Sequence, residues 1–431
     1  MKVLMFGWEY PPYITGGLGT ACYGIVKGLT SYPEIELTFV LPKAQDIHNT
    51  DRVRIVSASD VELSSSDIEL QKMLEEDYIK GRLAHISAYI TPEQYEELIR
   101  ARYREEINNY TKNGGKLTVS GQYEGNLFNE ISRYARIASE IARKQQHDVI
   151  HAHDWLTFQA GMEAKKISNK PLVLHVHATE FDRSGENYNP GVYKIEKEGM
   201  EMADRIITVS EFTRNIVINK YGINPAKVVT VHNAVDQVEN VKNIKFQPYI
   251  NEKVVTYLGR ITYQKGPEYF ILAAQKVLER MNNVRFVMAG SGDLSEKMIR
   301  YVASLGISDK FHFTGFLRGN DVFKMYSMSN LYVMPSVSEP FGISPLEALQ
   351  SGVPVIISKQ SGVAEVINHA IKVDFWDVHA MADAIYAIVN YGAIGNHMKN
   401  MGQKEVQNMR WSDTAGKIRN VYYDLFHRHA S

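Results

Sequence analysis

The chain has 431 residues, of which 44% are hydrophobic and 23% charged, a composition that can fill packed cores and excludes a disordered chain. Its 48 Lys and Arg residues balance 49 Asp and Glu residues, so no net positive charge would attract nucleic acid or an anionic membrane. The length exceeds that of most single domains, and we therefore expect two.

The first residues, Met1–Phe6, are apolar over too short a stretch for a secretory signal or a membrane span, and we interpret them as a strand. No other stretch approaches the roughly 20 apolar residues that a membrane helix needs. Cys22 is the only cysteine, so an internal disulfide is impossible, and we expect this side chain to pack in the core. These features predict a cytoplasmic protein without an integral membrane segment.

Short apolar, β-branched runs alternate with segments of helical periodicity in both halves of the chain. This alternation predicts parallel sheets with crossover helices. The strands predicted in the first half are Lys2–Phe6, Leu37–Leu41, Asp148–Ala152, Leu172–Val176, Arg205–Val209 and Val228–Val231. Those predicted in the second half are Val254–Leu258, Arg285–Met288, Phe311–Phe313, Leu331–Met334 and Val353–Ile357.

The predicted domains are an N-terminal domain over residues 1–240 and a C-terminal domain over residues 250–411, joined by the polar segment Asp236–Glu252. A final helix, about Asp413–Arg428, should pack back across this linker toward the N-terminal domain. The segment Leu63–Tyr110 is charged, helical in period and poor in strands, so we predict a helical insertion over about 63–125. It either decorates the fold or binds an acceptor or partner.

The loop after the strand Val254–Leu258 carries two cations, Arg260 and Lys265, and leads to Pro267. Proline is favoured at the first position of a helix, so both cations flank a predicted helix N-terminus. Ligands of open α/β sheets bind beyond the carboxyl ends of the strands, where helix N-termini attract anions. The loop therefore suits a diphosphate, and an ordinary exposed pair of cations is the alternative.

A second loop, after the strand Leu331–Met334, contains Glu339 and leads into a helix that we expect Ser344 to cap. Glu347 falls in the first turn, so both carboxylates should face one cleft while the amides of Gly342–Ser344 stay free for phosphate. Glu347 has a structural alternative, because it could close a capping box with Ser344. Glu339 has no such alternative, which favours contact with a ligand.

A glycine-rich turn, Gly16, Gly17 and Gly19, follows the first strand and opens a helix, so the backbone there can approach a phosphate or sugar closely. Its spacing lacks the last small residue of a dinucleotide fingerprint, as does the turn at Gly290, and no P-loop motif occurs. The sequence thus disfavours an NAD-dependent enzyme or a P-loop NTPase.

Two strands end in alternating histidines, His151 with His153 and His175 with His177. Because side chains alternate along a strand, each pair lies on one face of the sheet. Together with nearby aspartates they could hold zinc in a hydrolase, but no HExxH motif occurs and a hydrolase leaves the loops of the second half unexplained. The plainer hypothesis is that His177 faces a sugar while the other three pack or form hydrogen bonds near the strand ends.

The order of these motifs resembles that of the retaining GT-B transferases of glycosyltransferase family 4, close to glycogen synthases. The matching segments are GGL at 16–18, HAHDW at 151–155, VHATE at 176–180, GRITYQKG at 259–266, AGSGD at 289–293 and SEPFGISPLEAL at 338–349. They span nearly the whole chain, and the Arg-x4-Lys and Glu-x7-Glu elements are the most specific. The resemblance implies two Rossmann-like, doubly wound parallel-sheet domains that face a central cleft, with the insertion in the N-terminal domain.

The resemblance also implies roles for matching residues. Arg260 and Lys265 would hold the diphosphate of the donor, and Glu339 would bond the hydroxyls of its sugar. Glu347 would take the ribose, and His177 would contact the 6-hydroxyl of the sugar. The other implied donor contacts are Gly16, Gly17, Gly290, Phe316, Leu317, Gly342, Ile343 and Ser344. Among these, the backbone of Phe316 and Leu317 would contact the base of the nucleotide. Asp182, His153 and Trp155 would lie on the acceptor side.

No carboxylate is identifiable as a nucleophile, and the resemblance implies retention through an oxocarbenium-like state without a metal or other cofactor. The expected substrates are a nucleotide-diphosphate sugar, such as UDP- or ADP-glucose, and a glucan. A lipid, cell-wall or small-sugar acceptor is the alternative, and a metal hydrolase or a non-catalytic binder is less favoured. Ile14 stands where the longer bacterial synthases carry Lys, and those synthases usually lack Glu347, which family 4 members keep.

Overall fold

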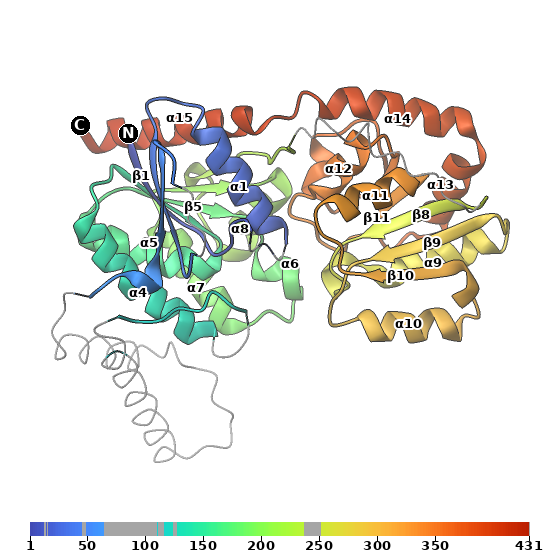
Figure 1. The fold of residues 1–431 in the computed structure, drawn as a ribbon, viewed down its shortest axis with the longest axis horizontal. Coiled ribbons are helices and arrows are strands. Elements are labelled where there is room, and N and C mark those ends of the chain that lie inside the picture. The colour runs from blue at the N-terminus through green and yellow to red at the C-terminus, as the bar shows by residue number, and fades with distance from the viewer. Residues whose placement is uncertain are drawn as a thin grey trace, which may run out of the picture.

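The computed structural model describes residues 1–12, 14, 16–44, 49–63, 110, 116–123, 127–236 and 251–430. Two parallel sheets, of seven and six strands, form the centres of two domains that lie side by side (Figure 1). Most of the predicted insertion at 63–125 and of the predicted linker lies outside the described residues. Within them, no helix is long and apolar enough to cross a membrane.

The N-terminal sheet has the order β3-β2-β1-β4-β5-β6-β7, and all its neighbours are parallel. Its strands are β1 (Lys2–Phe6), β2 (Glu36–Leu41), β3 (Val53–Ser57), β4 (Val149–His153), β5 (Leu172–Val176), β6 (Arg205–Thr208) and β7 (Val228–Thr230). The helices are α1 (Gly17–Leu29), α4 (Leu127–Lys144), α5 (Trp155–Ser168), α6 (Glu180–Ser184), α7 (Pro190–Met202) and α8 (Glu211–Tyr221), with short 3-10 turns η1 (Ala58–Asp60) and η2 (Pro225–Lys227).

The alternating directions of the side chains along β1 show why helices cover both faces of this sheet. Leu4 and Phe6 belong to a core built with α4, α5 and α7, whereas Val3 and Met5 belong to a second core built with α1 and the C-terminal helix. Because neighbouring side chains of a strand point to opposite faces, a strand that is apolar throughout needs helices on both sides.

The C-terminal sheet has the order β10-β9-β8-β11-β12-β13 and is also parallel. Its strands are β8 (Lys253–Leu258), β9 (Val284–Ala289), β10 (Phe311–Gly315), β11 (Leu331–Met334), β12 (Val355–Ser358) and β13 (Ile371–Val373). The helices are α9 (Pro267–Leu278), α10 (Ser295–Ser304), α11 (Asn320–Met328), α12 (Ser344–Gln350), α13 (Val378–Asn390) and α14 (Gly392–Val406), with the 3-10 turns η4 (Tyr263–Lys265), η5 (Ser308–Lys310) and η6 (Gly362–Glu365).

The last helix, α15 (Trp411–Ala430), leaves the C-terminal domain and lies along the N-terminal domain, so that the two chain ends come close together (Figure 1). It packs against α1, where two glycines allow the close approach. A Cβ built on Gly24 would lie 2.1 Å from the indole of Trp411, and one on Gly28 would lie 2.4 Å from the Trp411 carbonyl oxygen. Tyr422 of α15 reaches the sheet itself, where its hydroxyl lies 2.5 Å from His151 Nδ1.

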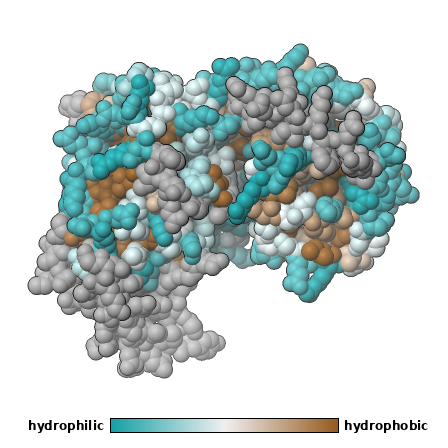
Figure 2. Space-filling view, viewed as in Figure 1, coloured by the Kyte–Doolittle hydropathy of each residue, from teal (hydrophilic) through white to brown (hydrophobic). Residues whose placement is uncertain are grey.

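A second contact between the domains is formed by the N-terminus of α8. The carboxylate of Glu365 in η6 accepts hydrogen bonds from the amides of Glu211 and Phe212, at 2.9 and 2.7 Å. Ser210, which caps α8, donates its hydroxyl to the carbonyl of Pro340 at 2.6 Å. Away from these contacts, the surface is hollowed between the two lobes in the view of Figure 2.

All eleven predicted strands are present, with ends that differ from the predictions by no more than two residues. The largest differences, of two residues, are at the start of β12, which begins at Val355 and not at Val353, and at the end of β10, which reaches Gly315 and not only Phe313. Two further strands, β3 and β13, were not predicted. Each lies at an edge of its sheet and contains a charged residue, Arg54 or Lys372, so neither reads as a buried apolar run. The structure confirms the predicted two-domain fold class.

Candidate active site

Two loops of the C-terminal domain meet at the ends of their strands. Gly266, between η4 and α9, has φ 63°, and a Cβ there would lie 2.1 Å from the carbonyl oxygen of Pro335. Only glycine therefore lets the loop after β8 press against the loop after β11. Across this contact Lys265 Nζ lies 2.5 Å from Glu339 Oε2. The cation and the carboxylate predicted to bind one donor thus come together.

Glu339 is held in place by several partners and is only 7% exposed. Its Oε2 also accepts a hydrogen bond from the Ser336 hydroxyl at 3.1 Å, and its amide donates to the carbonyl of Gln360 at 2.9 Å. Glu339 therefore has a structural partner within the protein, because the Lys265 ammonium group offsets its charge. A phosphate at this site would compete with Glu339 for the same ammonium group.

Arg260 lies on the same loop and is exposed. Within the described part of the chain its guanidinium makes one long contact, from Nη2 to Gln264 Oε1 at 3.5 Å. Gln264 is buried, and its carbonyl accepts the amide of Val337 at 2.9 Å, which ties the two loops together. An exposed cation thus stands beside two loops that are hydrogen-bonded to each other.

The start of α12 differs from the prediction. Ser344 is the first helical residue, Ile343 occupies the cap position, and no side chain caps the helix. The capping box between Ser344 and Glu347 is therefore absent, because Ser344 lies inside the helix and not before it. Among the described residues no acceptor faces the amides of Gly342, Ile343 and Ser344, so these donors remain open to a ligand.

Glu347 is half-buried in the first turn of α12. Burial raises the pKa of Glu347 to about 7, and the nearby carboxylate of Asp236 adds to this shift. Its carboxylate has no hydrogen-bond partner within the described part of the chain. A partly buried acid without a partner is a recognised mark of a functional site.

The turns after β9 and β10 lie where the resemblance places the base of the donor nucleotide. Gly290 has φ 137°, and a Cβ there would lie 1.9 Å from the carbonyl oxygen of Gly259, so packing within the protein already requires glycine. The Gly290 amide donates to the carbonyl of Gly315 at 2.9 Å. Next to it Phe316 is 46% exposed, with the guanidinium of Arg318 5.3 Å from its ring centroid, while Leu317 packs against the core.

In the N-terminal domain, His177 follows β5 and is held by Asp154, which follows β4. Asp154 Oδ1 accepts hydrogen bonds from the amides of His177 at 2.6 Å and Ala178 at 3.2 Å. Asp154 has φ 58° and ψ 169°, a region that residues other than glycine rarely adopt. Backbone strain of this kind is retained where the surroundings enforce it, commonly at functional sites. The sequence had suggested Asp154 only as a neighbour of a metal.

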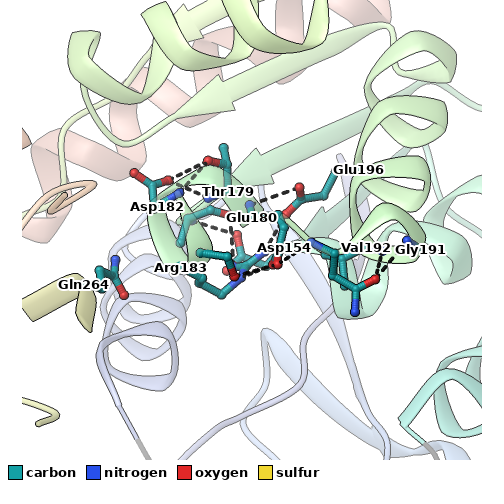
Figure 3. A network of polar contacts seen from close by, with 12 residues as sticks. Asp154, Thr179, Glu180, Asp182, Arg183, Gly191, Val192, Glu196 and Gln264 are labelled. Carbon is teal, nitrogen blue, oxygen red and sulfur yellow. Dashed lines mark hydrogen bonds and ion pairs between the residues drawn. The ribbon is translucent and has the colours of Figure 1, made fainter. Parts of the chain in front are cut away.

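A network of charged side chains around Arg183 lies next to Asp154 (Figure 3). Its guanidinium contacts Glu180 at 3.1 Å and Glu196 at 2.5 Å, and Tyr221 donates its hydroxyl to Glu196. Burial raises the pKa of Asp154 to about 7, even though Arg183 opposes the shift. Burial alone would lower the pKa of Arg183, but the surrounding carboxylates raise it instead. Apart from the polar residues of the VHATE segment, no pattern in the sequence indicated this network.

Asp182 connects this network to the other domain. Its Oδ2 accepts the amide and hydroxyl of Thr179 in a capping box at the start of α6, each at 2.7 Å. Its Oδ1 accepts the hydroxyl of Ser338 at 2.5 Å. Ser338 directly precedes Glu339, so this bond joins the His177 turn to the loop of the C-terminal domain that pairs with Lys265. Figure 3 shows Gln264 of that domain beside the same network.

Trp155 is packed against other side chains, whereas within the described part of the chain the glycine turn at Gly16 and Gly17 is not. Trp155 opens α5 and packs on Phe128, with the guanidinium of Arg183 6.0 Å from its ring centroid. A Cβ on Gly16 or Gly17 would meet no atom of the described residues within 4 Å, so packing against these residues does not demand glycine at either position.

Glu9 was not identified from the sequence. A Cβ on Gly19 would lie 3.0 Å from Glu9 Oε2, which places this buried carboxylate beside the glycine turn. Its Oε1 accepts the hydroxyl of Tyr123 at 2.5 Å. The sequence signal was slight, a lone carboxylate just after the first strand.

The four histidines form one cluster at the ends of β4 and β5. His153 Nδ1 lies 2.9 Å from His177 Nε2, and the ring centroids of His175 and His177 are 4.3 Å apart. Burial lowers the pKa of all four, to about 3 for His151 and His177, so the rings are neutral near pH 7. Two groups of side chains in this region could hold a metal ion, His151 with His153 and His175, and Cys22 with His153 and His177.

Comparison with known proteins gives consistent matches along the chain. Residues 240–405 match the family model described as glycosyl transferases group 1, and residues 99–238 match that of glycosyltransferase family 4. An uncharacterized glycosyltransferase of Methanocaldococcus jannaschii is 28% identical, and the match covers 98% of each chain. The glycogen synthase of Mycobacterium tuberculosis is 22% identical over 98% of this chain and 94% of its own. Among solved structures, sucrose-phosphate synthase from Thermosynechococcus elongatus has a TM-score of 0.70, with 18% identity and 99% of both chains covered.

Proposed function

We propose that this chain, which belongs to the GT-B glycosyltransferases of family 4, transfers glucose from UDP- or ADP-glucose to the non-reducing end of an α-1,4-glucan. The similarity to a glycogen synthase along almost the whole chain supports this choice of substrate. A family 4 transferase with a lipid, cell-wall or small-sugar acceptor is the alternative, and the experiment below distinguishes the two.

The observation that carries the proposal is the meeting of Lys265 and Glu339 at 2.5 Å, with Arg260 on the same loop. A donor diphosphate would take Lys265 from Glu339, and the freed carboxylate could then accept hydrogen bonds from the sugar hydroxyls. Arg260 would swing from its long contact with Gln264 onto the phosphate, which guanidinium groups bind well. The unpaired amides before α12 would complete the anion site, and Glu347 would accept a ribose hydroxyl.

The sugar would lie between the two domains, with His177 on its far side. The bond from Ser338 to Asp182 brings the His177 turn next to the Glu339 loop, so both can contact one hexose. His177 is neutral, and its Nδ1 has no partner, which leaves that atom for a sugar hydroxyl. The open space around Gly16 and Gly17 supports their placement beside the diphosphate and the anomeric carbon.

Catalysis would be mainly electrostatic and would proceed with retention. As the bond from the anomeric carbon to phosphate breaks, negative charge grows on the departing diphosphate, where Arg260 and Lys265 stabilise it. A departing phosphate oxygen would accept the proton of the acceptor hydroxyl as that hydroxyl attacks the same face. Two cations and free amides supply the counter-charge, so we propose that no divalent metal is needed at the diphosphate. A reducing compartment such as the cytoplasm suits the buried Cys22.

The test is to incubate the purified protein with a panel of nucleotide sugars, with and without glycogen, and to measure released nucleoside diphosphate. Release from UDP- or ADP-glucose that depends on glycogen supports the proposal. Release that depends only on a lipid-linked, cell-wall or small-sugar acceptor supports the alternative. Tight donor binding without release with any acceptor would refute transfer by this chain.

A further inference from the structure

The histidine cluster contains more unpaired polar atoms than any other buried region of the described chain. His151, His153 and His175 are each 0% exposed, yet His151 Nε2, His153 Nε2 and both ring nitrogens of His175 have no hydrogen-bond partner. Leaving one buried polar atom unpaired costs about 1–3 kcal/mol. A group of such atoms in one place is evidence for a partner that the protein atoms do not supply.

The three side chains are arranged so that one ligand atom from each lies within 4.8 Å of the others. Two of them are neighbours along β4, and His175 is the direct register partner of His153 on β5. Tetrahedral zinc with Zn–N bonds of about 2.0–2.1 Å holds its ligand atoms about 3.4 Å apart. Rotation of the imidazole side chains by about an ångström at the nitrogen atoms would therefore close the group around one ion.

We propose that His151, His153 and His175 bind one Zn²⁺ ion inside the N-terminal domain, next to His177. Imidazole nitrogen is a preferred zinc ligand, and three histidines with one further ligand such as water make a known tetrahedral arrangement. Each of the three side chains offers a ring nitrogen without a partner among the described residues, so an ion held by these nitrogens breaks no hydrogen bond of the structure. The site is independent of the proposed substrate.

The other ring nitrogens of two of these ligands already have hydrogen-bond partners, and such partners orient metal-bound histidines. His151 Nδ1 lies 2.5 Å from the Tyr422 hydroxyl of α15, and His153 Nδ1 lies 2.9 Å from His177 Nε2. With zinc on Nε2, His153 must carry its proton on Nδ1 and donate it to His177. His177 then keeps its own proton on Nδ1, so the ion would fix the tautomer of His177 and anchor α15 to the sheet.

The second group, Cys22 with His153 and His177, is a poorer site. Binding there would use His153, which the first group also needs, so the two sites exclude each other. It would also require the Cys22 thiolate, although burial raises the pKa of that thiol. The two groups differ in chemistry, since only the second places sulfur on the metal, and spectroscopy can separate them.

The experiment uses full-length, tag-free protein that is stripped with a chelator and titrated with Zn²⁺ against a chromophoric competitor. We expect one ion per chain and an increase in melting temperature with zinc. His175→Gln should lower the affinity at least tenfold and abolish the temperature shift. Tyr422→Phe, which keeps the ring and removes only the partner of His151, should weaken binding about 10–100-fold.

The control is Cys22→Ser, which should bind zinc as the wild type does. Co²⁺ in place of zinc should give tetrahedral d–d absorption without a thiolate charge-transfer band in the near ultraviolet. Such a band, absent in Cys22→Ser, would move the site to the other group and overturn the assignment. A folded apoprotein that takes up no zinc would overturn it as well, and so would unchanged affinity in both His175→Gln and Tyr422→Phe.

Discussion

The ends of the strands in the two domains present contrasting surfaces. In the N-terminal domain, Asp154, Asp182 and Glu196 are buried, and each is bonded to an amide, hydroxyl or guanidinium of the protein. In the C-terminal domain, Arg260 is exposed, Glu347 lacks a partner in the described structure, and the amides before α12 are open. The carboxylates named in the first domain are bonded within the protein, whereas the loops of the second leave a cation, an acid and amides open to a ligand.

The contrast indicates that the N-terminal surface contributes mainly to the stability of the site and the C-terminal surface mainly to ligand binding. Buried, bonded carboxylates keep the His177 turn rigid, and their interactions are strong because little water screens them. Exposed cations and free amides can bind a diphosphate and release it again. Substitutions should therefore reduce stability on the N-terminal side and turnover on the C-terminal side.

The largest effect is expected for Arg183→Met. The substitution leaves Glu180 and Glu196 without the guanidinium that pairs with them and removes its favourable charge near Asp154, and unpaired buried charge typically costs about 3–5 kcal/mol. Urea unfolding should show this decrease in the free energy of unfolding. Arg300→Met, which removes an exposed pair with Glu296, should change it by no more than about 1 kcal/mol. Equal losses in the two variants would contradict a buried network.

Lys265→Ala should reduce kcat by at least about 10²–10³-fold, the cost of losing one preorganised charge-stabilising donor, while the fold remains intact. Released nucleoside diphosphate measures turnover, and thermal unfolding checks the fold. Lys297→Ala, which loses an exposed pair with Glu268, should turn over normally. Near-normal turnover of Lys265→Ala would refute the role of Lys265.

Gly24→Ala tests whether α15 supports the N-terminal surface. The added Cβ would lie 2.1 Å from Trp411, and such overpacking usually costs about 1–3 kcal/mol. Thermal unfolding should show the loss. Gly392→Ala adds a Cβ that meets no atom within 4 Å and should be close to neutral. Similar unfolding temperatures for Gly24→Ala and wild type would show that α15 contributes little.

The smallest effect concerns the pH dependence of stability. The pKa of Glu347 is raised from 4.5 to about 7 by burial, so between these values the folded state binds more protons than the unfolded state. Stability therefore falls as pH rises through this window. Glu347→Gln should reduce this fall, although Asp154, whose pKa is also about 7, keeps part of it. Urea unfolding at several pH values from about 5 to 8 tests this, and an unchanged slope would count against a raised pKa for Glu347.

Much of the fold followed from the sequence, because its signals are local. Apolar runs predicted eleven of the strands. Because the carboxyl ends of parallel strands lie at one edge of the sheet, the loops after β8 and β11 were expected to share a site. The same reasoning failed at Ser344, because a cap and a first helical residue look alike in sequence and only the backbone angles of the loop decide between them. It also missed β3, whose pairing with β2 compensates for its weak apolar pattern.

The sequence by itself thus determined the order of the elements, the two charged, glycine-containing loops after β8 and β11, and which histidines lie on the same face of the sheet. Only the tertiary structure decided that Lys265 pairs with Glu339, that Asp182 bonds Ser338 and that Tyr422 reaches His151. These partners lie 74, 156 and 271 residues apart. Periodicity and turn chemistry act over a few residues, whereas such contacts depend on how whole sheets and helices pack, which no local pattern encodes.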